Sequence, residues 1–403
     1  MQNAIEMVNI TKTFGDKVVA NSNVTMNIRH KEILSLLGEN GSGKTTLMNM
    51  LAGIYYPDSG QIFFDGKEVS ITSPSDAYHL GIGMVHQHFK LIDVFSALEN
   101  ILLGLPSSLD PKEVRSKVEE ICNKYGFELN LDAKVYDMSV SEKQTLEIVK
   151  TLYRGAEVLI LDEPTAVLTP QETRKLFNVI KNMRDDGKAI VIITHKLNEV
   201  LEVSDRVTIL RKGEYVGTVD TKDATEQLLT EMMVGQKVEL NINRDLIEHK
   251  EKRLEVAHLS VTNNDGKKVV NDATFDLYSG EIMGIAGISG CGQKELLEAI
   301  MGLTKADDDS SVIYHSTAHG DHQLVGLSTE KIRGFGLHLA FVPEDRLGMG
   351  LVGNMGMTEN VLLKRYKKGS GPFLHTKKPT EMAQKIMNDL DVKTPSLEYP
   401  LRR

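Results

Sequence analysis

The stretch GENGSGKTT at residues 38–46 directly follows an apolar run at residues 33–37. An apolar strand, a glycine-rich loop and the tripeptide Gly-Lys-Thr, in this order, are typical of a phosphate-binding loop that opens a helix. Glycines allow the backbone to turn its N–H groups toward phosphate oxygens, and the N-terminus of the following helix adds positive potential. The stretch therefore predicts an α/β domain that binds a nucleoside triphosphate.

Each residue of this loop has an expected place around the phosphates. The ammonium group of Lys44 supplies a positive charge for the β and γ phosphates, and the hydroxyl of Thr45 is an expected ligand of the Mg²⁺ ion that bridges them. The other loop residues are expected to contact the nucleotide through their backbone or to flank that contact. They are Gly38, Glu39, Asn40, Gly41, Ser42, Gly43 and Thr46.

Length and composition limit the class of protein. A chain of 403 residues predicts roughly two to three domains. It contains no run of 18 or more apolar residues and no basic and apolar leader, so we expect neither a membrane span nor a secretion signal. Cys122 and Cys291, without CxxC spacing, suit a reducing cytosol and predict no metal site. A formal net charge of -9 argues against a broad basic surface, so no nucleic acid partner is expected.

The chain also repeats itself. The segment LLGENGSGKTTLMNMLAGI at 36–54 is echoed by IAGISGCGQKELLEAIMGL at 285–303, and SALENILLG at 96–104 is echoed by GMTENVLLK at 356–364. Because the order of the segments is kept, duplication is the simplest explanation. The expected boundaries are 1–235 for a first domain, 236–253 for a charged linker and 254–403 for a second domain.

Buried parallel strands are predicted in the first half, where three apolar runs each end at a polar residue. They are residues 33–37 before Gly38, 158–161 before Asp162, and 189–193 before Thr194 and His195. Ligands of open α/β sheets bind at the carboxyl ends of the strands, so we expect these three ends to converge on one nucleotide. Residues 97–155 have the spacing of amphipathic helices instead and predict an inserted helical subdomain.

Polar residues after these strands are the candidates for catalysis. Asp162 is expected to hold Mg²⁺, and Glu163 to orient and polarise the water that attacks the γ phosphate. His195 is expected to hydrogen-bond the γ phosphate or that water, and Gln87, in the loop MVHQHF, is a candidate ligand of Mg²⁺ and water. The alternatives are a capped turn for the acidic pair and a structural role for the histidine.

Phe14 is a candidate for stacking on adenine. It precedes the first core strand in the phrase TKTFGDKVV, where a flat ring has access to the base. The alternative is an ordinary core aromatic residue, and the sequence leaves both interpretations open.

Taken together, the order of these motifs resembles that of the ATP-binding subunits of ABC transporters. The matching segments are a Walker A loop at 38–46, a glutamine loop at Gln87, MSVSEKQ at 138–144 in the place of the signature, a Walker B strand with DEPTA at 162–166, and the switch residue His195. The tandem halves and the phrases DEPTAVLTPQE and VPEDRLGMGLV are similar to the fused ATPases of bacterial sugar and nucleoside importers. VPEDR, GLV and TENVLL favour the nucleoside branch.

This resemblance implies a fold, an activity and partners. The fold would be that of a P-loop NTPase with an inserted helical subdomain, followed by a partial second copy. The activity would be ATP hydrolysis with Mg²⁺, coupled to uptake of nucleosides or simple sugars. The implied partners are transmembrane permease subunits and an extracellular solute-binding lipoprotein, which would place the chain at the cytoplasmic side of the cell membrane.

The signature segment implies a contact with ATP across two halves. In the family two halves clamp head to tail, and the signature of one completes the γ-phosphate site of the other. The signature serine corresponds to Ser139 here. Val140 and Ser141 replace two glycines of the usual signature, and Thr169 stands where an aspartate is usual after Walker B.

The second half departs further from the family pattern. Gln293 occupies the position of the phosphate-binding lysine, Lys294 that of the metal-binding hydroxyl, and Glu344 that of the loop glutamine. Removing a cation and a metal ligand should weaken the binding of a triphosphate. We therefore expect a weak or regulatory nucleotide site in the second half.

The last residue, Arg403, stands directly before the position where alignment of the halves places a second signature. The expectation is therefore a C-terminally incomplete second half. Either the sequence is a fragment of a longer protein, or the chain binds ATP without efficient turnover unless another chain, such as a second copy in a homodimer, supplies the missing surface. Two alternatives are a non-catalytic ATP-binding regulatory fragment and a soluble ribosome-associated tandem ATPase. The ribosome-associated class would be expected to have two intact Walker loops and a long charged linker.

Overall fold

A computed structural model describes two compact units, Met1–Arg244 and Asp245–Arg403. The structure describes residues 2–402 except 16–17, 88, 107, 238–249, 264–265, 288–289, 319, 338–339, 341, 344–347, 349, 364–373, 391 and 393. Most of the predicted linker at 236–253 therefore lies outside the described residues, as does Glu344. Each unit is described by itself below.

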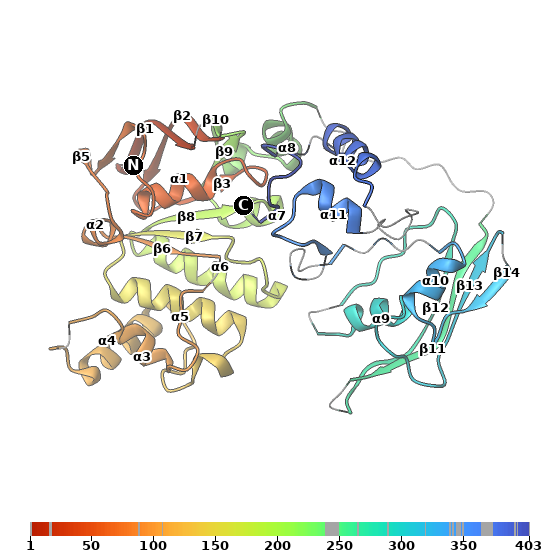
Figure 1. The fold of residues 1–403 in the computed structure, drawn as a ribbon. Helices are drawn as coiled ribbons and strands as arrows, with labels where there is room; N and C mark the ends of the chain where they lie inside the picture. The colour runs from red at the N-terminus through yellow and green to blue at the C-terminus, as the bar shows by residue number, and fades with distance from the viewer. Residues whose placement is uncertain are drawn as a thin grey trace. The chain divides into compact units, whose positions relative to one another are not determined.

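A six-stranded sheet forms the centre of the first unit, in the order β10-β9-β3-β8-β7-β6 (Figure 1). Its strands are β3 (Ile33–Leu37), β6 (Ile82–Val85), β7 (Val158–Asp162), β8 (Ala189–Thr194), β9 (Arg206–Arg211) and β10 (Glu214–Asp220). All neighbouring pairs are parallel except β9 and β10. Every residue of β3, β7 and β8 is buried, which confirms the three predicted parallel strands.

The register of this sheet aligns the ends of three strands. Leu37, the last residue of β3, pairs with Thr194, the last residue of β8. Asp162 at the end of β7 pairs with Ile193 of β8. The polar residues that follow these strands therefore emerge at one edge of the sheet, as the sequence predicts.

A second, antiparallel sheet has the order β2-β1-β4-β5. Its strands are β1 (Asn3–Phe14), β2 (Val18–Arg29), β4 (Ser59–Phe64) and β5 (Lys67–Val69). Helix α1 (Lys44–Leu51) directly follows the glycine-rich loop, as predicted. Buried Leu47 and Met48 of this helix share one apolar core with Met7 of β1 and Leu34 of β3. The start of α1 is thus fixed by packing against both sheets.

Helices α5 (Val140–Tyr153) and α6 (Pro170–Asp185) cover the other face of the six-stranded sheet (Figure 1). Buried Ile148 of α5 and Phe177 of α6 pack with Leu159 of β7 and Ile190 of β8. Helix α5 also shares a core with α3 (Ala97–Leu102) and α4 (Pro111–Tyr125), between which no described strand lies. The remaining helical segments of this unit are α2 (Pro74–His79), η1 (Val135–Asp137), α7 (Leu197–Val203), η2 (Thr221–Asp223) and α8 (Glu226–Val234).

The second unit repeats the antiparallel sheet of the first. Its strands β11 (Lys252–Thr262), β12 (Lys268–Tyr278), β13 (Ser311–Ser316) and β14 (Gly320–Gln323) have the order β12-β11-β13-β14, which matches β2-β1-β4-β5. Helix α9 (Gln293–Ile300) follows a glycine turn, as α1 does. The other helices are α10 (Thr329–Gly334), α11 (Met357–Leu363) and α12 (Lys377–Asp389). Among the described residues, no helix is long and apolar enough to cross a membrane.

Backbone details of the two sheets also correspond. Asn9 and Asn23 have positive φ angles of 54° and 51°, and His258 and Asp272, each 249 residues further on, have 52° and 55°. Positive φ is unusual for residues other than glycine. Two equivalent left-handed residues in each unit support the duplication that the sequence repeat predicts.

We predict that Gly83→Ala destabilises the first unit. A Cβ at Gly83 in β6 would lie 2.2 Å from Cγ2 of Thr151 in α5 and 3.1 Å from Cβ of Ala156. Overpacking of this kind costs about 1–3 kcal/mol. Gly217→Ala in β10 is the matched control, because its Cβ would meet only the flexible end of Met232, at 3.0 Å. Urea unfolding should show a clear loss for the first variant alone; equal stability of both variants would contradict the packing argument.

Candidate nucleotide-binding site

The loop between β3 and α1 depends on two left-handed glycines. Gly41 and Gly43 have φ angles of 80° and 91°. A Cβ at Gly43 would lie 2.3 Å from the carbonyl oxygen of Ala20, a distance that no side chain tolerates. Gly43 is also the N-cap of α1 and has no side chain to cap the first N–H groups. The helix therefore begins with free donors facing the loop, an arrangement suited to phosphate.

Lys44 is held inside this loop. Its side chain is only 6% exposed, and its Nζ donates to the carbonyl oxygens of Gly38 and Glu39, at 2.8 Å each. Burial lowers the pKa of Lys44, while the carboxylates of Glu163 and Asp162 act in the opposite direction. A cation is thus positioned beside the free donors of α1.

Several of the predicted residues line one cavity of about 330 Å³, whereas Gly38, Glu39, Ser42 and His195 do not. Its lining residues are Asn40, Gly41, Gly43, Lys44, Thr45, Thr46, Gln87, Asp162 and Glu163. They come from the loop, from the end of β7 and from the segment after β6. Three segments that are far apart in the sequence therefore meet at one edge of the sheet.

Thr45 and Asp162, the two residues predicted to hold Mg²⁺, lie next to each other in the cavity lining. The Thr45 hydroxyl donates to Oδ1 of Asp162 at 3.4 Å. Burial raises the pKa of Asp162, and the hydrogen bond from Thr45 lowers it. Among the described residues, no group of three or more His, Cys, Asp or Glu side chains could hold a metal by itself. A hydroxyl and one carboxylate suit Mg²⁺, which keeps several waters and binds phosphate oxygens as well.

Glu163 connects the other two candidate catalytic residues. Nδ1 of His195 lies 2.9 Å from Oε1 of Glu163, and Nε2 of Gln87 donates to Oε2 at 3.2 Å. The backbone of Glu163 has a φ of 46°, which is uncommon for a residue with a side chain, and its N–H donates to the carbonyl of Ile193 in β8. The turn after β7 therefore aims this carboxylate between the glutamine loop and the histidine.

Phe14 and Ser139 lie outside the cavity lining. The Phe14 ring is 39% exposed at the end of β1 and meets the Tyr55 ring edge-on, with the ring centroids 5.1 Å apart. Ser139 is the N-cap of α5, and its hydroxyl accepts from the backbone N–H of Glu142. The structure of this unit does not bring the signature serine to the unit's own phosphate loop.

The sequence reasoning missed a network behind the catalytic residues. Nζ of Lys196 donates to the carbonyl oxygen of Thr165 at 2.9 Å and contacts Oε1 of Glu199 at 3.0 Å. The Thr165 hydroxyl donates to the other oxygen of Glu199. This network ties the segment after β7 to the segment after β8. The threonine of DEPTA and the charges after His195 were the available signals.

The glycine turn of the second unit is similar, but its side chains differ. A Cβ at Gly292, where φ is 91°, would lie 2.2 Å from the carbonyl oxygen of Val269. Lys294, whose side chain is 57% exposed, lies with its Nζ 3.8 Å from Glu298 on the same helix. The amide of Gln293 lies over Gly287, where an added Cβ would be 2.8 Å from Nε2. The second loop therefore keeps its turn, while its described lysine pairs along the helix surface.

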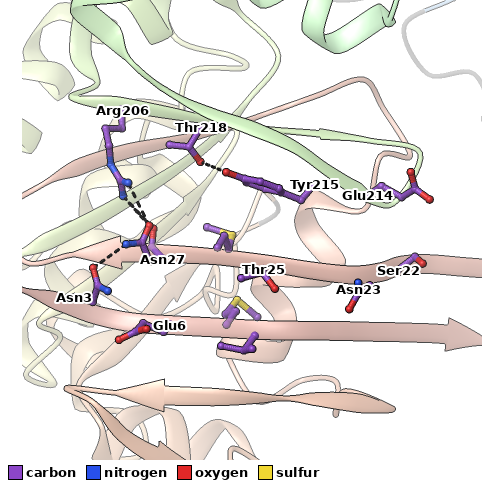
Figure 2. A pocket seen from close by; sticks show the side chains of 13 residues that line it. Asn3, Glu6, Ser22, Asn23, Thr25, Asn27, Arg206, Glu214, Tyr215 and Thr218 are labelled. Atoms are coloured by element: carbon purple, nitrogen blue, oxygen red, sulfur yellow. Dashed lines mark hydrogen bonds between the residues drawn. The ribbon is translucent and has the colours of Figure 1, made fainter.

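A larger hollow of about 760 Å³ lies elsewhere in the first unit, between β1, β2 and β10 (Figure 2). Figure 2 shows that several of its polar groups pair with one another: Arg206 with Asn27, Asn27 with Asn3, and Tyr215 with Thr218. None of the predicted site residues lines it. The larger hollow is therefore separate from the predicted nucleotide site.

Known proteins are similar to this chain in sequence and in fold. The chain matches the ABC transporter family over residues 21–166 and 270–398. It is 42% identical to the nucleoside import ATP-binding protein NupA of Lactococcus lactis subsp. cremoris, over 97% of this chain and 77% of that protein. It is 41% identical to the guanosine import ATP-binding protein NupO of Bacillus subtilis, over 99% of this chain and 78% of that protein.

Two further similarities are lower. The glucose import ATP-binding protein TsgD13 of Haloferax volcanii is 38% identical, over 96% of this chain and 76% of that protein. The crystal structure of the ADP conformation of MJ1267, an ATP-binding cassette of an ABC transporter, has a TM-score of 0.51 at 24% identity. The structural match covers 58% of this chain and 96% of the MJ1267 chain. At this identity the structural likeness shows the cassette fold alone.

We predict that Lys44→Ala weakens ATP binding by about a hundredfold, because charge-assisted hydrogen bonds of about 1.5–3 kcal/mol each are lost. Gln293→Ala at the matching position of the second unit is the control and should change affinity for ATP far less. Equilibrium titration with a fluorescent ATP analogue measures both variants. Unchanged binding by Lys44→Ala would rule out this site, and an equal loss in both would show that the second loop binds the nucleotide as strongly.

Proposed function

Because the chain belongs to the ABC transporter family, as an ATP-binding subunit with two family regions in tandem, we propose that it energises the import of nucleosides. The two nucleoside-import relatives are 42% and 41% identical, and the glucose-import relative is 38% identical. Import of a simple sugar is the second candidate, since the three identities are close.

One observation carries the proposed catalytic role: Lys44, Asp162 and Glu163 line the same small cavity. We propose that the loop backbone and the Lys44 ammonium bind the β and γ phosphates, as the free N–H groups of α1 and the buried cation support. The nucleotide base would reach Phe14, whose ring is partly exposed and meets Tyr55 edge-on.

Mg²⁺ is part of this proposal. When bound, it would supply positive charge that neutralises the negative charge developing during phosphoryl transfer. The Thr45 hydroxyl, Asp162 and Gln87 are the residues proposed to hold it, directly or through water. The hydrogen bond between Thr45 and Asp162 supports this assignment, because both oxygens already face the same point of the cavity.

We assign general-base catalysis to Glu163. Its carboxylate would accept a proton from the attacking water, while His195 would keep the carboxylate and the γ phosphate in place. In the structure both carboxylate oxygens are occupied, one by His195 and one by Gln87. Because each carboxylate oxygen can accept more than one hydrogen bond, the attacking water can approach beside these two contacts. The signature residue Ser139 would complete the γ-phosphate site from an opposite half.

Permease subunits are the proposed mechanical partners. Gln87 follows β6, and the chain then leads through residues 89–96 into α3 of the helical part. A change at the γ phosphate would thus reach the helical part through Gln87, which is a common way to convert phosphate contacts into motion. We propose that the chain acts at the cytoplasmic side of the membrane, bound to transmembrane permeases that receive solute from an extracellular binding lipoprotein.

Uptake tests the proposed solute. The gene for this chain would be deleted in its own host, and uptake of radiolabelled guanosine, adenosine, ribose and glucose measured. Loss of nucleoside uptake alone, restored by the wild-type chain but not by Lys44→Ala, is the expected result. Loss of ribose or glucose uptake alone would overturn the nucleoside assignment in favour of sugars.

We predict that Glu163→Gln retains ATP but stops hydrolysis by the transporter assembled with its permeases. The amide keeps the shape and the contact with Gln87 or His195 but cannot accept the proton. Turnover should fall at least about a hundredfold, as general-base catalysis contributes about 10²–10⁴. Phosphate release and nucleotide binding are the two measurements. Undiminished turnover would show that another group is the base.

A further inference from the structure

A buried asparagine lies behind the phosphate loop. Asn21 of β2 is 0% exposed, and its Nδ2 donates to the carbonyl oxygen of Gly43 at 3.2 Å. Its Oδ1 is buried without a hydrogen-bond partner among the described residues. An unpartnered buried oxygen costs stability, so this amide is not explained by stability alone.

The hydrogen bond from Asn21 acts on the peptide unit that carries the first N–H group of α1. The carbonyl of Gly43 also accepts the first helical hydrogen bond of α1, from the N–H of Leu47 at 2.9 Å. The carbonyl of Gly43 and the N–H of Lys44 belong to one planar peptide unit and point in opposite directions. A donor that fixes the carbonyl therefore also fixes the direction of the Lys44 N–H, one of the free donors at the start of α1.

The contact is tight and is supported from a second side. A Cβ at Gly43 would lie 2.6 Å from Nδ2 of Asn21, so the amide packs directly on the turn. The turn between β9 and β10 bonds to the neighbours of both residues: the N–H of Gly213 donates to the carbonyl of Ser42 at 3.2 Å, and its carbonyl accepts from the N–H of Ser22 at 2.8 Å. The loop is thus held from behind by β2 and by this turn.

The second unit provides an internal comparison. Val270 stands 249 residues after Asn21, at the corresponding place in β12, and its Cγ2 lies 3.2 Å from a Cβ built on Gly292. The carbonyl of Gly292 accepts from the N–H of Leu296 at 2.9 Å, as Gly43 does from Leu47. Valine has no group that donates to it. The unit with the loop lysine has the amide, and the unit with Gln293 lacks it.

We propose that Asn21 is a positioning residue for triphosphate binding: its amide orients the Gly43–Lys44 peptide so that the Lys44 N–H points at phosphate. This inference rests on the proposed ATP site at the first loop. The asparagine is retained despite the cost of its unpartnered oxygen, because its amide favours phosphate binding and not folding. ATP and ADP both carry the phosphates next to the loop, so both should depend on Asn21.

The test separates affinity from stability. Asn21→Leu keeps the shape of the side chain but removes both polar atoms. We expect an unfolding free energy equal to or above that of the wild type, because the unpartnered oxygen disappears. Affinity for fluorescent analogues of ATP and ADP should fall about tenfold each, the usual effect of one lost hydrogen bond. Urea unfolding and equilibrium titration of the full chain are the two measurements.

Asn100→Leu is the matched control. Asn100 of α3 is 1% exposed and donates to the carbonyls of Ile92 and Ser96, away from the loop. Its loss should lower stability and leave affinity for both nucleotides unchanged. Asn21→Val, which introduces the residue of the second unit, is the second variant. If the leucine variant does not fold, stability and nucleotide affinity are measured on the valine variant instead.

The outcomes distinguish the inference from the proposed function. If the wild type and Lys44→Ala bind ATP equally, the proposed site itself fails. If Lys44→Ala loses ATP while the Asn21 variants bind like the wild type, the inference fails and the site stands. A loss of stability in both Asn21 variants without a loss of affinity would assign Asn21 a structural role and also overturn the inference.

Discussion

The left-handed turn at Gly43, closed against the carbonyl oxygen of Ala20, is the constraint on which the rest of the site depends. With an added Cβ only 2.3 Å from that oxygen, the chain can enter α1 at this point only through glycine. The turn starts the helix at Lys44, so the free N–H groups of its first turn and the lysine side chain face the same cavity. The strands β3, β7 and β8 end in register, which brings Asp162 and Glu163 to this cavity.

The acidic residues differ in their surroundings although they are adjacent. Asp162 is buried beside the Thr45 hydroxyl, which suits a ligand of a cation. Glu163 leaves the strand with a positive φ and turns its carboxylate toward His195 and Gln87. The two carboxylates line one cavity but contact different groups. Behind them, Lys196, Thr165 and Glu199 hold the two loops together, so the relation between Glu163 and His195 depends on contacts outside the cavity.

The duplication shows which features of the fold are independent of nucleotide chemistry. The antiparallel sheet, its left-handed residues and the glycine turn before the helix recur in the second unit. The lysine, the hydroxyl after it and the buried asparagine do not, since Gln293, Lys294 and Val270 take their places. A scaffold can therefore be kept by packing while the groups proposed to bind phosphate or to position the loop are lost.

Sequence alone determined much of this protein. The loop GENGSGKTT, the three apolar runs that end in polar residues, and the repeat at 285–303 predicted the α/β class, the strands β3, β7 and β8, the start of α1 and the meeting of Lys44 with Asp162 and Glu163. These predictions succeed because apolar periodicity and glycine turns act locally along the chain. Only the tertiary structure decided the roles of Asn21 and of the network around Lys196. Asn21 contacts Gly43 and Lys196 contacts Thr165, 22 and 31 residues away in the sequence, and pairing at that distance depends on how strands and loops pack.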